Sequence, residues 1–145
     1  MPQSYLNAKT VHSIGELKSD DRVTKLGRLQ MEYVATIIGL GRHNLEVILT
    51  GERRRHYLTD HPEMAQHENE LRHVVLNPDE VHRNRKEPHT AIFYRRVDNT
   101  YFLRVAIVLQ ARAGTLKHSV FSFRLAKQKE VEAGRRAGRV IWSKK

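Results

Sequence analysis

The residues with the clearest capacity for chemistry fall in one short segment, residues 53–63, which has the sequence RRRHYLTDHPE. His56 and His61 carry imidazoles, and an imidazole exchanges protons near neutral pH. The arginines at 53–55 carry guanidinium groups, which bind phosphate oxygens through paired hydrogen bonds. Acid–base groups beside phosphate-binding cations are the combination that chemistry on a phosphodiester needs. The competing interpretation is a solvated, charged helix end, because most runs of charge are solvated faces.

The balance of charge in the chain is strongly basic. Its 145 residues carry a formal net charge of +10, and the isoelectric point is near 10.2. An excess of that sign favours a polyanionic partner: a nucleic acid, an acidic protein or an anionic membrane surface. The chain has no cysteine, which excludes disulfide, zinc–thiolate and thiol-nucleophile chemistry. A chain of this length is expected to form one domain with a core of its own.

No segment has the pattern of a secretion signal or a membrane span. Residues 1–14 lack an apolar run behind a basic start. The longest apolar runs, residues 34–40 and 105–109, are too short to cross a bilayer. We therefore expect a soluble, cytoplasmic protein.

Start and stop signals place two helices around the chemical segment. Thr50 is a suitable N-cap, so a helix is expected from about Gly51 to Asp60. His61 precedes a proline and avoids the helical conformation, so the helix breaks there. Pro62 suits the first turn of the next helix.

The second helix is expected to bury one of its faces. Four apolar side chains fall at helical spacing and form a core-facing stripe: Met64, Leu71, Val74 and Val75. The Asn-Pro-Asp turn at 77–79 ends this helix.

Alternating patterns and turn signals predict the strands of an antiparallel sheet. The predicted strands are residues 31–40 (with a buried helix as the alternative), 46–49, 80–83, 90–97, 101–110, 118–125 and 140–142. Turns are expected at 41–44, 98–100 and 113–115, and a helix at 126–133 that ends at Gly134 and Gly138. The fold class is α+β, with N-terminal helices packed on an antiparallel β-meander. Residues 1–45 form an N-terminal extension and residues 46–145 the main domain, together one compact unit.

Alternation within each strand assigns its side chains to two faces. In the strand at 101–110 one apolar face, expected to pack against the helices, consists of Leu103, Val105, Ile107 and Leu109. The other face of the sheet is expected to gather polar side chains on one concave surface: Thr90, Tyr94, Arg104, His118, Ser122 and Arg124. An arginine inside so apolar a strand needs a carboxylate or a bound anion as its partner, which makes Arg104 a candidate. An ordinary sheet with one solvated face is the alternative.

From about Val47 onward, several short motifs follow one another along the chain. They are His56, His61-Pro62-Glu63, Asn77-Pro78-Asp79, Arg85-Lys86 with Thr90, the apolar strand 103–109, Ser119-Val120-Phe121-Ser122 and Val140-Ile141-Trp142. In their order and spacing the chain resembles the phage-associated nuclease families of the barnase–EndoU–colicin–RelE-like (BECR) group, over about two thirds of its length. Asp60 stands where that pattern has an arginine, and residues 1–45 lie outside the resemblance.

The resemblance implies a BECR-like ribonuclease fold and a small, metal-independent endoribonuclease without a cofactor. Such an enzyme acts as a toxin or as a phage or mobile-element effector in the bacterial cytoplasm. It cleaves RNA by attack of the 2′-hydroxyl on the adjacent phosphorus, which leaves a 2′,3′-cyclic phosphate. The implied partners are RNA, such as tRNA or rRNA, and an acidic immunity or antitoxin protein, with no membrane partner.

A site for this reaction needs a base, an acid and cations around the phosphorus. The expected acid–base groups are His56 as the principal one and His61 or His118 as its complement. The groups expected to stabilise phosphate and bind the substrate are Arg85, Lys86, Arg104, His118 and Arg124. The groups expected to orient the phosphate by hydrogen bonds are Thr90, Tyr94 and Ser122.

Other classes of function fit the sequence less well or remain as alternatives. A zinc hydrolase is disfavoured because His56 and His61 are five residues apart rather than four, and no third ligand is evident. A serine hydrolase would need a Gly-x-Ser-x-Gly elbow, which is missing. A non-catalytic module for RNA or DNA stays an alternative, with the basic tail 127–145 on phosphate and with bases stacked on Tyr94, Tyr101 and Phe102. A phage structural protein is the other alternative.

Overall fold

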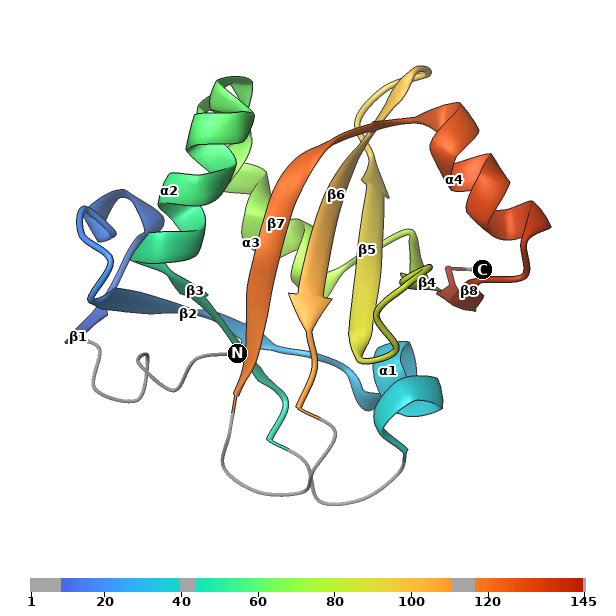
Figure 1. Ribbon diagram of the computed structural model, residues 1–145, viewed down its shortest axis with the longest axis horizontal. Helices are drawn as coiled ribbons and strands as arrows, with labels where there is room; N and C mark the ends of the chain where they lie inside the picture. The colour runs from blue at the N-terminus through green and yellow to red at the C-terminus, as the bar shows by residue number, and fades with distance from the viewer. Residues whose placement is uncertain (1–8, 40–43, 111–116, 145) are drawn as a thin grey trace.

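One eight-stranded sheet runs through the part of the chain that the computed structural model describes, residues 9–39, 44–110 and 117–144 (Figure 1). The strand order is β1-β2-β3-β7-β6-β5-β4-β8. The strands are β1 (Lys9–Val11), β2 (Arg22–Arg28), β3 (Glu46–Thr50), β4 (Glu80–Arg83), β5 (Thr90–Arg96), β6 (Tyr101–Val108), β7 (His118–Lys127) and β8 (Val140–Ser143). The helices are α1 (Met31–Ile38), α2 (Gly51–Asp60), α3 (Glu68–Leu76) and α4 (Gln128–Arg136), with 3₁₀ segments η2 (Ile14–Glu16) and η3 (Pro62–His67). The turn predicted at 113–115 and all but the last residue of the turn predicted at 41–44 lie outside the described residues.

The predicted antiparallel meander is confirmed, and it forms the middle of the sheet. β4, β5, β6 and β7 are consecutive strands, and each pairs antiparallel with the next. β8 pairs antiparallel with β4 at one edge. At the other edge β3 pairs in parallel with β7, through Val47–His118 and Ile48–Ser119, and β2 and β1 continue the sheet beyond β3. The protein is therefore α+β, and residues 9–28 add strands that the sequence analysis did not predict.

The start and stop signals predicted for α2 are confirmed. The Thr50 side-chain oxygen accepts a hydrogen bond from the Arg53 backbone N–H at 3.1 Å, which caps the helix. α2 ends at Asp60, and His61 leaves the helical conformation with a φ of −139°. Pro62 starts η3, so the chain makes a 3₁₀ segment before α3 instead of the single α-helix that was predicted.

The apolar stripe predicted for the following helix is also confirmed. Its four members, Met64, Leu71, Val74 and Val75, are fully buried. Among residues 9–39, 44–110 and 117–144, no helix has both the length and the apolar character needed to cross a membrane.

The strand predicted over residues 31–40 is wrong, because residues 31–38 form α1. Its β-branched and apolar composition suits a strand, but Tyr33, Val34 and Ile38 are spaced so that they bury one face of a helix. Gly39 ends the helix with a φ of 78°, a conformation that glycine adopts without strain. The Tyr33 ring lies 4.5 Å from the Trp142 ring, so α1 covers the β8 end of the sheet.

α4 continues past Gly134, the residue that was expected to end it. A Cβ atom at residue 134 would lie 2.4 Å from the His82 Nδ1 atom. The glycine therefore allows α4 to approach β4 closely, and it does not terminate the helix. Gly138, with a φ of 73°, follows the helix end.

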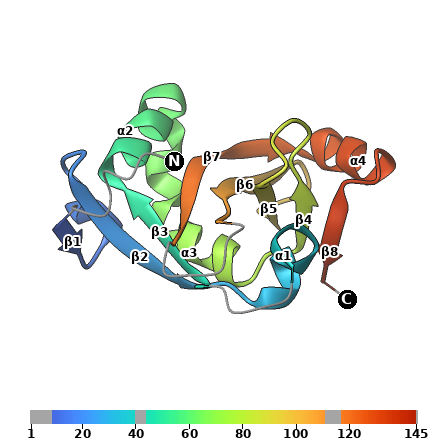
Figure 2. The ribbon, with the colours of Figure 1, turned by 60° about the horizontal axis from the view of Figure 1, so that its bottom comes forward.

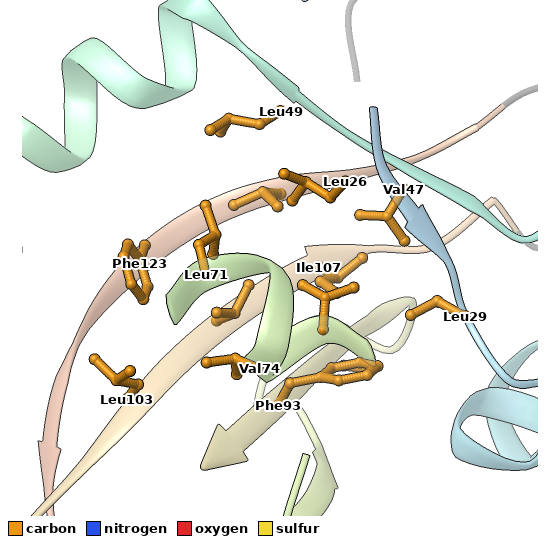
Figure 3. Close-up of a cluster of buried hydrophobic side chains, with 14 of the residues drawn as sticks. Leu26, Leu29, Val47, Leu49, Leu71, Val74, Phe93, Leu103, Ile107 and Phe123 are labelled. Atoms are coloured by element: carbon orange, nitrogen blue, oxygen red, sulfur yellow. The ribbon is translucent and has the colours of Figure 1, made fainter. Parts of the chain in front are cut away.

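Each face of the sheet carries a hydrophobic cluster. The main core lies between the sheet and α2, η3 and α3, and it includes the predicted apolar face of β6 (Figure 3). Some of its side chains are Leu26, Val47, Leu71, Phe93, Leu103 and Phe123. The second face carries a smaller cluster beneath α4: Ile92, Tyr94, Phe102, Ala106, Ala126 and Val131. α3 and α4 thus lie on opposite sides of the central strands (Figure 2).

A glycine at the start of α2 sets the distance between this helix and the β2 end of the sheet. A Cβ atom at residue 51 would lie 1.9 Å from the Ser19 carbonyl oxygen, a backbone atom with little freedom to move. We expect Gly51→Ala to lower the free energy of unfolding by about 1–3 kcal/mol, the usual cost of overpacking. Urea denaturation measures this loss. The control is Gly15→Ala, where the added Cβ atom meets nothing within 4 Å; equal stability of the two variants would contradict the close contact.

Candidate functional site

A β-bulge in β7 decides which of its side chains reach the second face. Ser122 is opposite Ala106 of β6, but Val120 is opposite Ile107, so Phe121 is an extra residue without a partner. An extra residue reverses the alternation of the strand, because side chains point to the two faces in turn. Ser122 and the residues after it keep the predicted face, and the residues before Phe121 exchange faces.

His118 is therefore not on the concave surface predicted for it. It is fully buried, and its Nδ1 atom accepts a hydrogen bond from the Gln110 backbone N–H at 2.9 Å. Its strand neighbour in β3 is Val47, a residue of the main core. The expectation that His118 faces the same surface as Arg104 is wrong, because the bulge interrupts the alternation of side chains in β7.

The second face does bring four of the predicted residues together, with one carboxylate that was not predicted. We call this group the charged cluster: Tyr94, Arg104, Ser122, Arg124 and Glu130. Tyr94, Arg104 and Arg124 lie side by side on β5, β6 and β7. Glu130 comes from the first turn of α4 and is the partner that an arginine in this strand was expected to need.

The Glu130 carboxylate accepts hydrogen bonds from two side chains and lies within ion-pair distance of a third. Both terminal nitrogens of Arg124 donate to it, at 3.1 and 3.0 Å, and the Tyr94 hydroxyl donates at 3.3 Å. Arg104 Nε lies 3.3 Å from the same carboxylate, and an Arg104 terminal nitrogen lies 3.5 Å from the Ser122 hydroxyl. The side chains of Arg124 and Glu130 are 29% and 37% exposed, so a ligand in solution can reach the cluster.

The charged cluster contains two guanidinium groups and one carboxylate, so its net charge is positive. Burial lowers the pKa of Arg104, and the positive charge of Arg124 lowers it further. Burial raises the pKa of Tyr94, and the charge of Glu130 adds to the rise, so the phenol stays protonated and donates its hydrogen bond. A bound anion would stabilise both arginines in this partly desolvated place.

A second set of charges attaches α4 to β4 and so fixes where Glu130 stands. Arg135 donates to the two carboxylate oxygens of Glu80 at 3.0 and 2.5 Å. The His82 Nε2 atom lies 2.6 Å from the same carboxylate, and the His82 ring lies 4.8 Å from the Tyr94 ring. The anchored α4 helix holds the Glu130 carboxylate over the second face of the sheet.

Three other predicted residues lie at the far end of β5. Thr90 is on the second face, but four residues of strand, about 13 Å, separate it from Tyr94. Arg85 and Lys86 are exposed in the β4–β5 loop beside Thr90. The structure therefore does not bring these three into the charged cluster.

The three consecutive arginines of α2 have separate partners. Arg54 forms a partly buried ion pair with Glu68 of α3, at 2.9 Å for each of two bonds. Arg55 pairs with Asp20 on the surface at 3.0 Å. Arg53 turns towards β7, where its guanidinium lies 4.1 Å from the centre of the Phe121 ring. One of the three guanidinium groups thus contacts β7, at the residue before Ser122.

The two histidines of the chemical segment lie on α2 and at its end, and neither belongs to the charged cluster. His56 is exposed on α2, one turn after Arg53 and on the same side of the helix. His61 ends α2, with its Nδ1 atom 3.8 Å from Glu63. Among the hydrogen bonds and ion pairs of the described residues, none joins either histidine to the cluster.

In the described part of the chain, no three histidine, cysteine or acidic side chains lie close enough together to hold a metal ion. No protein-family model, curated protein or solved structure matches the chain.

The ion pair that anchors α4 gives the stability a defined pH dependence. Burial on its own would raise the pKa of Glu80, but the hydrogen bonds and charges of His82 and Arg135 outweigh it and lower the pKa from 4.5 to about 2. Because the pKa is lower in the folded state, ionised Glu80 stabilises the fold above about pH 4.5. This stabilisation disappears as the pH falls towards 2.

We expect Glu80→Gln to unfold about 2 kcal/mol more easily than the wild type near pH 6, and the difference to vanish as the pH approaches 2. Urea denaturation at a series of pH values measures this. Glu87→Gln, which changes an exposed carboxylate, is the matched control. A difference for Glu80→Gln that stays constant with pH would contradict the lowered pKa.

Proposed function

We propose that the protein is a metal-independent endoribonuclease with its active site at the charged cluster. The observation that carries the proposal is the pairing of Arg104 and Arg124 around one carboxylate, on the accessible second face. A phosphate group would supply the negative charge that the two arginines lack, and guanidinium–phosphate hydrogen bonds are among the strong ones. The net charge of +10 supports a polyanionic substrate.

In the proposed reaction the ribose 2′-hydroxyl attacks the adjacent phosphorus. The Glu130 carboxylate accepts the 2′ proton, the bond from the 2′-oxygen to phosphorus forms, and the bond from phosphorus to the 5′-oxygen breaks. Arg104 and Arg124 stabilise the negative charge that builds up on the phosphoryl oxygens. Tyr94 orients Glu130, and Ser122 orients Arg104. The products are a 2′,3′-cyclic phosphate and a 5′-hydroxyl.

The leaving 5′-oxygen needs a proton, and we assign this step to His56. The imidazole is the side chain that donates protons most readily near neutral pH. His56 lies one turn along α2 from Arg53, and Arg53 contacts the residue next to Ser122. In this proposal Glu130 takes the place of a second histidine, so His61 and His118 receive no role in proton transfer.

The order of the elements supports a BECR-like domain over residues 46–145. Two helices, α2 and α3, precede the four-stranded meander and cover one of its faces, as the resemblance implies. The candidate site is on the opposite face. The proposal extends to a toxin or phage effector with an acidic inhibitor protein, whose carboxylates would compete with phosphate for Arg104 and Arg124.

A non-catalytic RNA-binding module is the second candidate. It is favoured by four exposed cations in and around α4: Lys127, Lys129, Arg136 and Lys144. The stacking roles expected for Tyr94 and Phe102 in such a module are wrong, because these side chains are 4% and 1% exposed. Such a module would lose affinity gradually as its cations are removed, whereas catalysis would depend on single side chains.

The test is cleavage of a labelled RNA pool in EDTA. We expect the wild type to leave 2′,3′-cyclic phosphate ends. Glu130→Gln and His56→Ala should each cleave at least about 100-fold more slowly than the wild type, which is the usual contribution of an acid–base group. Urea denaturation of Glu130→Gln separates a lost proton acceptor from a lost fold.

The matched controls are Glu132→Gln, which removes the same charge from the same helix, and His12→Ala, which removes an exposed imidazole far along the chain. Both should cleave like the wild type. If the wild type binds RNA but leaves every RNA intact, the binding module replaces the ribonuclease as the better account.

A further inference from the structure

We propose that Phe121 and Arg53 form a stacking site for an unpaired RNA base, beside the phosphate site of the charged cluster. The proposal rests on the function proposed above and adds the part of the substrate that is recognised next to the cleaved bond. Phe121 offers an aromatic ring, and Arg53 offers a cation on that ring. Stacked bases on aromatic side chains, with arginine nearby, are the usual means of binding single strands.

Phe121 is on the surface although nothing in its strand pairing requires a phenylalanine there. Its side chain is 49% exposed, and among the described residues Val97 is the one other large apolar side chain with comparable exposure. Phe121 is the extra residue of the bulge, and bulges next to active sites commonly redirect a side chain. Exposing an aromatic ring to water is unfavourable. A ligand that stacks on the ring would explain why a phenylalanine is exposed at position 121.

Arg53 fixes both the ring and the backbone of Phe121. Its guanidinium carbon lies 4.1 Å from the ring centre, and its Nε atom donates a hydrogen bond to the Phe121 carbonyl oxygen at 2.9 Å. Phe121 lies two residues after Ser119, the last residue of β7 that pairs with β3. The ring is thus supported by a cation and remains about half exposed to a ligand.

A comparison within the protein separates this pair from a structural contact of the same type. Arg96 also lies over an aromatic ring, 4.5 Å from the centre of Phe102. Phe102, however, is 1% exposed and belongs to the cluster beneath α4. The Arg96–Phe102 contact covers the edge of a core, whereas the Arg53–Phe121 pair faces solvent.

The position of the pair matches the connectivity of a nucleotide. Phe121 immediately precedes Ser122, whose hydroxyl lies beside Arg104 in the charged cluster. In RNA one ribose joins a base to its phosphate, so a base on Phe121 and a phosphate at Arg104 can belong to one nucleotide or to adjacent ones. A base in a duplex has neighbours on both faces, so the site selects single-stranded RNA. Because every base has a π-face, the site does not select a base identity.

The experiment measures binding without cleavage. A short 2′-O-methyl oligonucleotide lacks the attacking hydroxyl, and one 2-aminopurine in it reports stacking by loss of fluorescence. We compare the wild type with Phe121→Ala, Phe121→Trp and, as a control for an exposed apolar side chain away from the site, Val97→Ala. We expect Phe121→Ala to bind about tenfold more weakly or worse and to lose the quenching, because a stacked base contributes on that scale. Phe121→Trp and Val97→Ala should bind and quench like the wild type.

A second oligonucleotide lacks the base at the position of the 2-aminopurine, and it tests whether the loss of affinity comes from stacking. The wild type should lose affinity when the base is removed, and Phe121→Ala should lose none, because the partner of the base is already gone. If Phe121→Ala binds and quenches like Val97→Ala, or if the wild type does not bind the oligonucleotide, the stacking site is wrong.

Cleavage of natural RNA by the same variants separates the two proposals. A wild type that cleaves RNA while Phe121→Ala keeps full affinity would overturn the stacking site and leave the ribonuclease standing. A wild type that cleaves nothing but stacks a base on Phe121 would overturn the ribonuclease and leave the stacking site as part of a binding module.

Discussion

Arg104 is a charged side chain in the middle of an apolar strand, and burying a guanidinium is costly unless an anion lies beside it. The fold supplies that anion by turning the chain from the end of β7 directly into α4, whose first turn carries Glu130. For α4 to lie over this face it must approach β4 closely, and Gly134 makes the approach feasible. The Glu80–Arg135 ion pair then holds the helix. The shape of the second face therefore follows from the need to place one carboxylate beside Arg104.

The bulge at Phe121 gives β7 two different surroundings along its length. Before the bulge His118 and Val120 point into the main core, and after it Ser122 and Arg124 point to the second face. One inserted residue thus separates a strand segment that stabilises the sheet from a segment that presents polar groups. The residue at the division is the exposed aromatic ring on which Arg53 lies.

The parts of the fold that could be predicted from the sequence depend on local physical chemistry. The cap at Thr50 and the break at His61 are decided by side-chain hydrogen bonding and by proline sterics within a few residues. The strands of the meander are long enough for alternation to identify them, and the short loops between them leave antiparallel pairing as the simplest arrangement.

The parts that could not be predicted depend on distant neighbours. The segment 31–38 has a composition that suits a strand, and packing against β8 makes it a helix. His118 was placed on the wrong face because a bulge leaves no mark in a list of apolar and polar residues. Glu130 was not predicted although a partner for Arg104 was expected, since nothing local distinguishes it from Glu132, the other glutamate of α4.

The parallel contact between β3 and β7 divides the sheet into two parts with different folding entropy. Within the meander no more than nine residues separate a strand from the next one, so little chain entropy is lost when the pair forms. Between β3 and β7 the chain passes through α2, α3, β4, β5 and β6, and among the described residues two pairs of positions join the strands. Contacts of such long range form late in folding. The face that carries the charged cluster is thus assembled from the part of the chain that can fold early, a difference that pulsed hydrogen exchange of β6 and β3 amides would report.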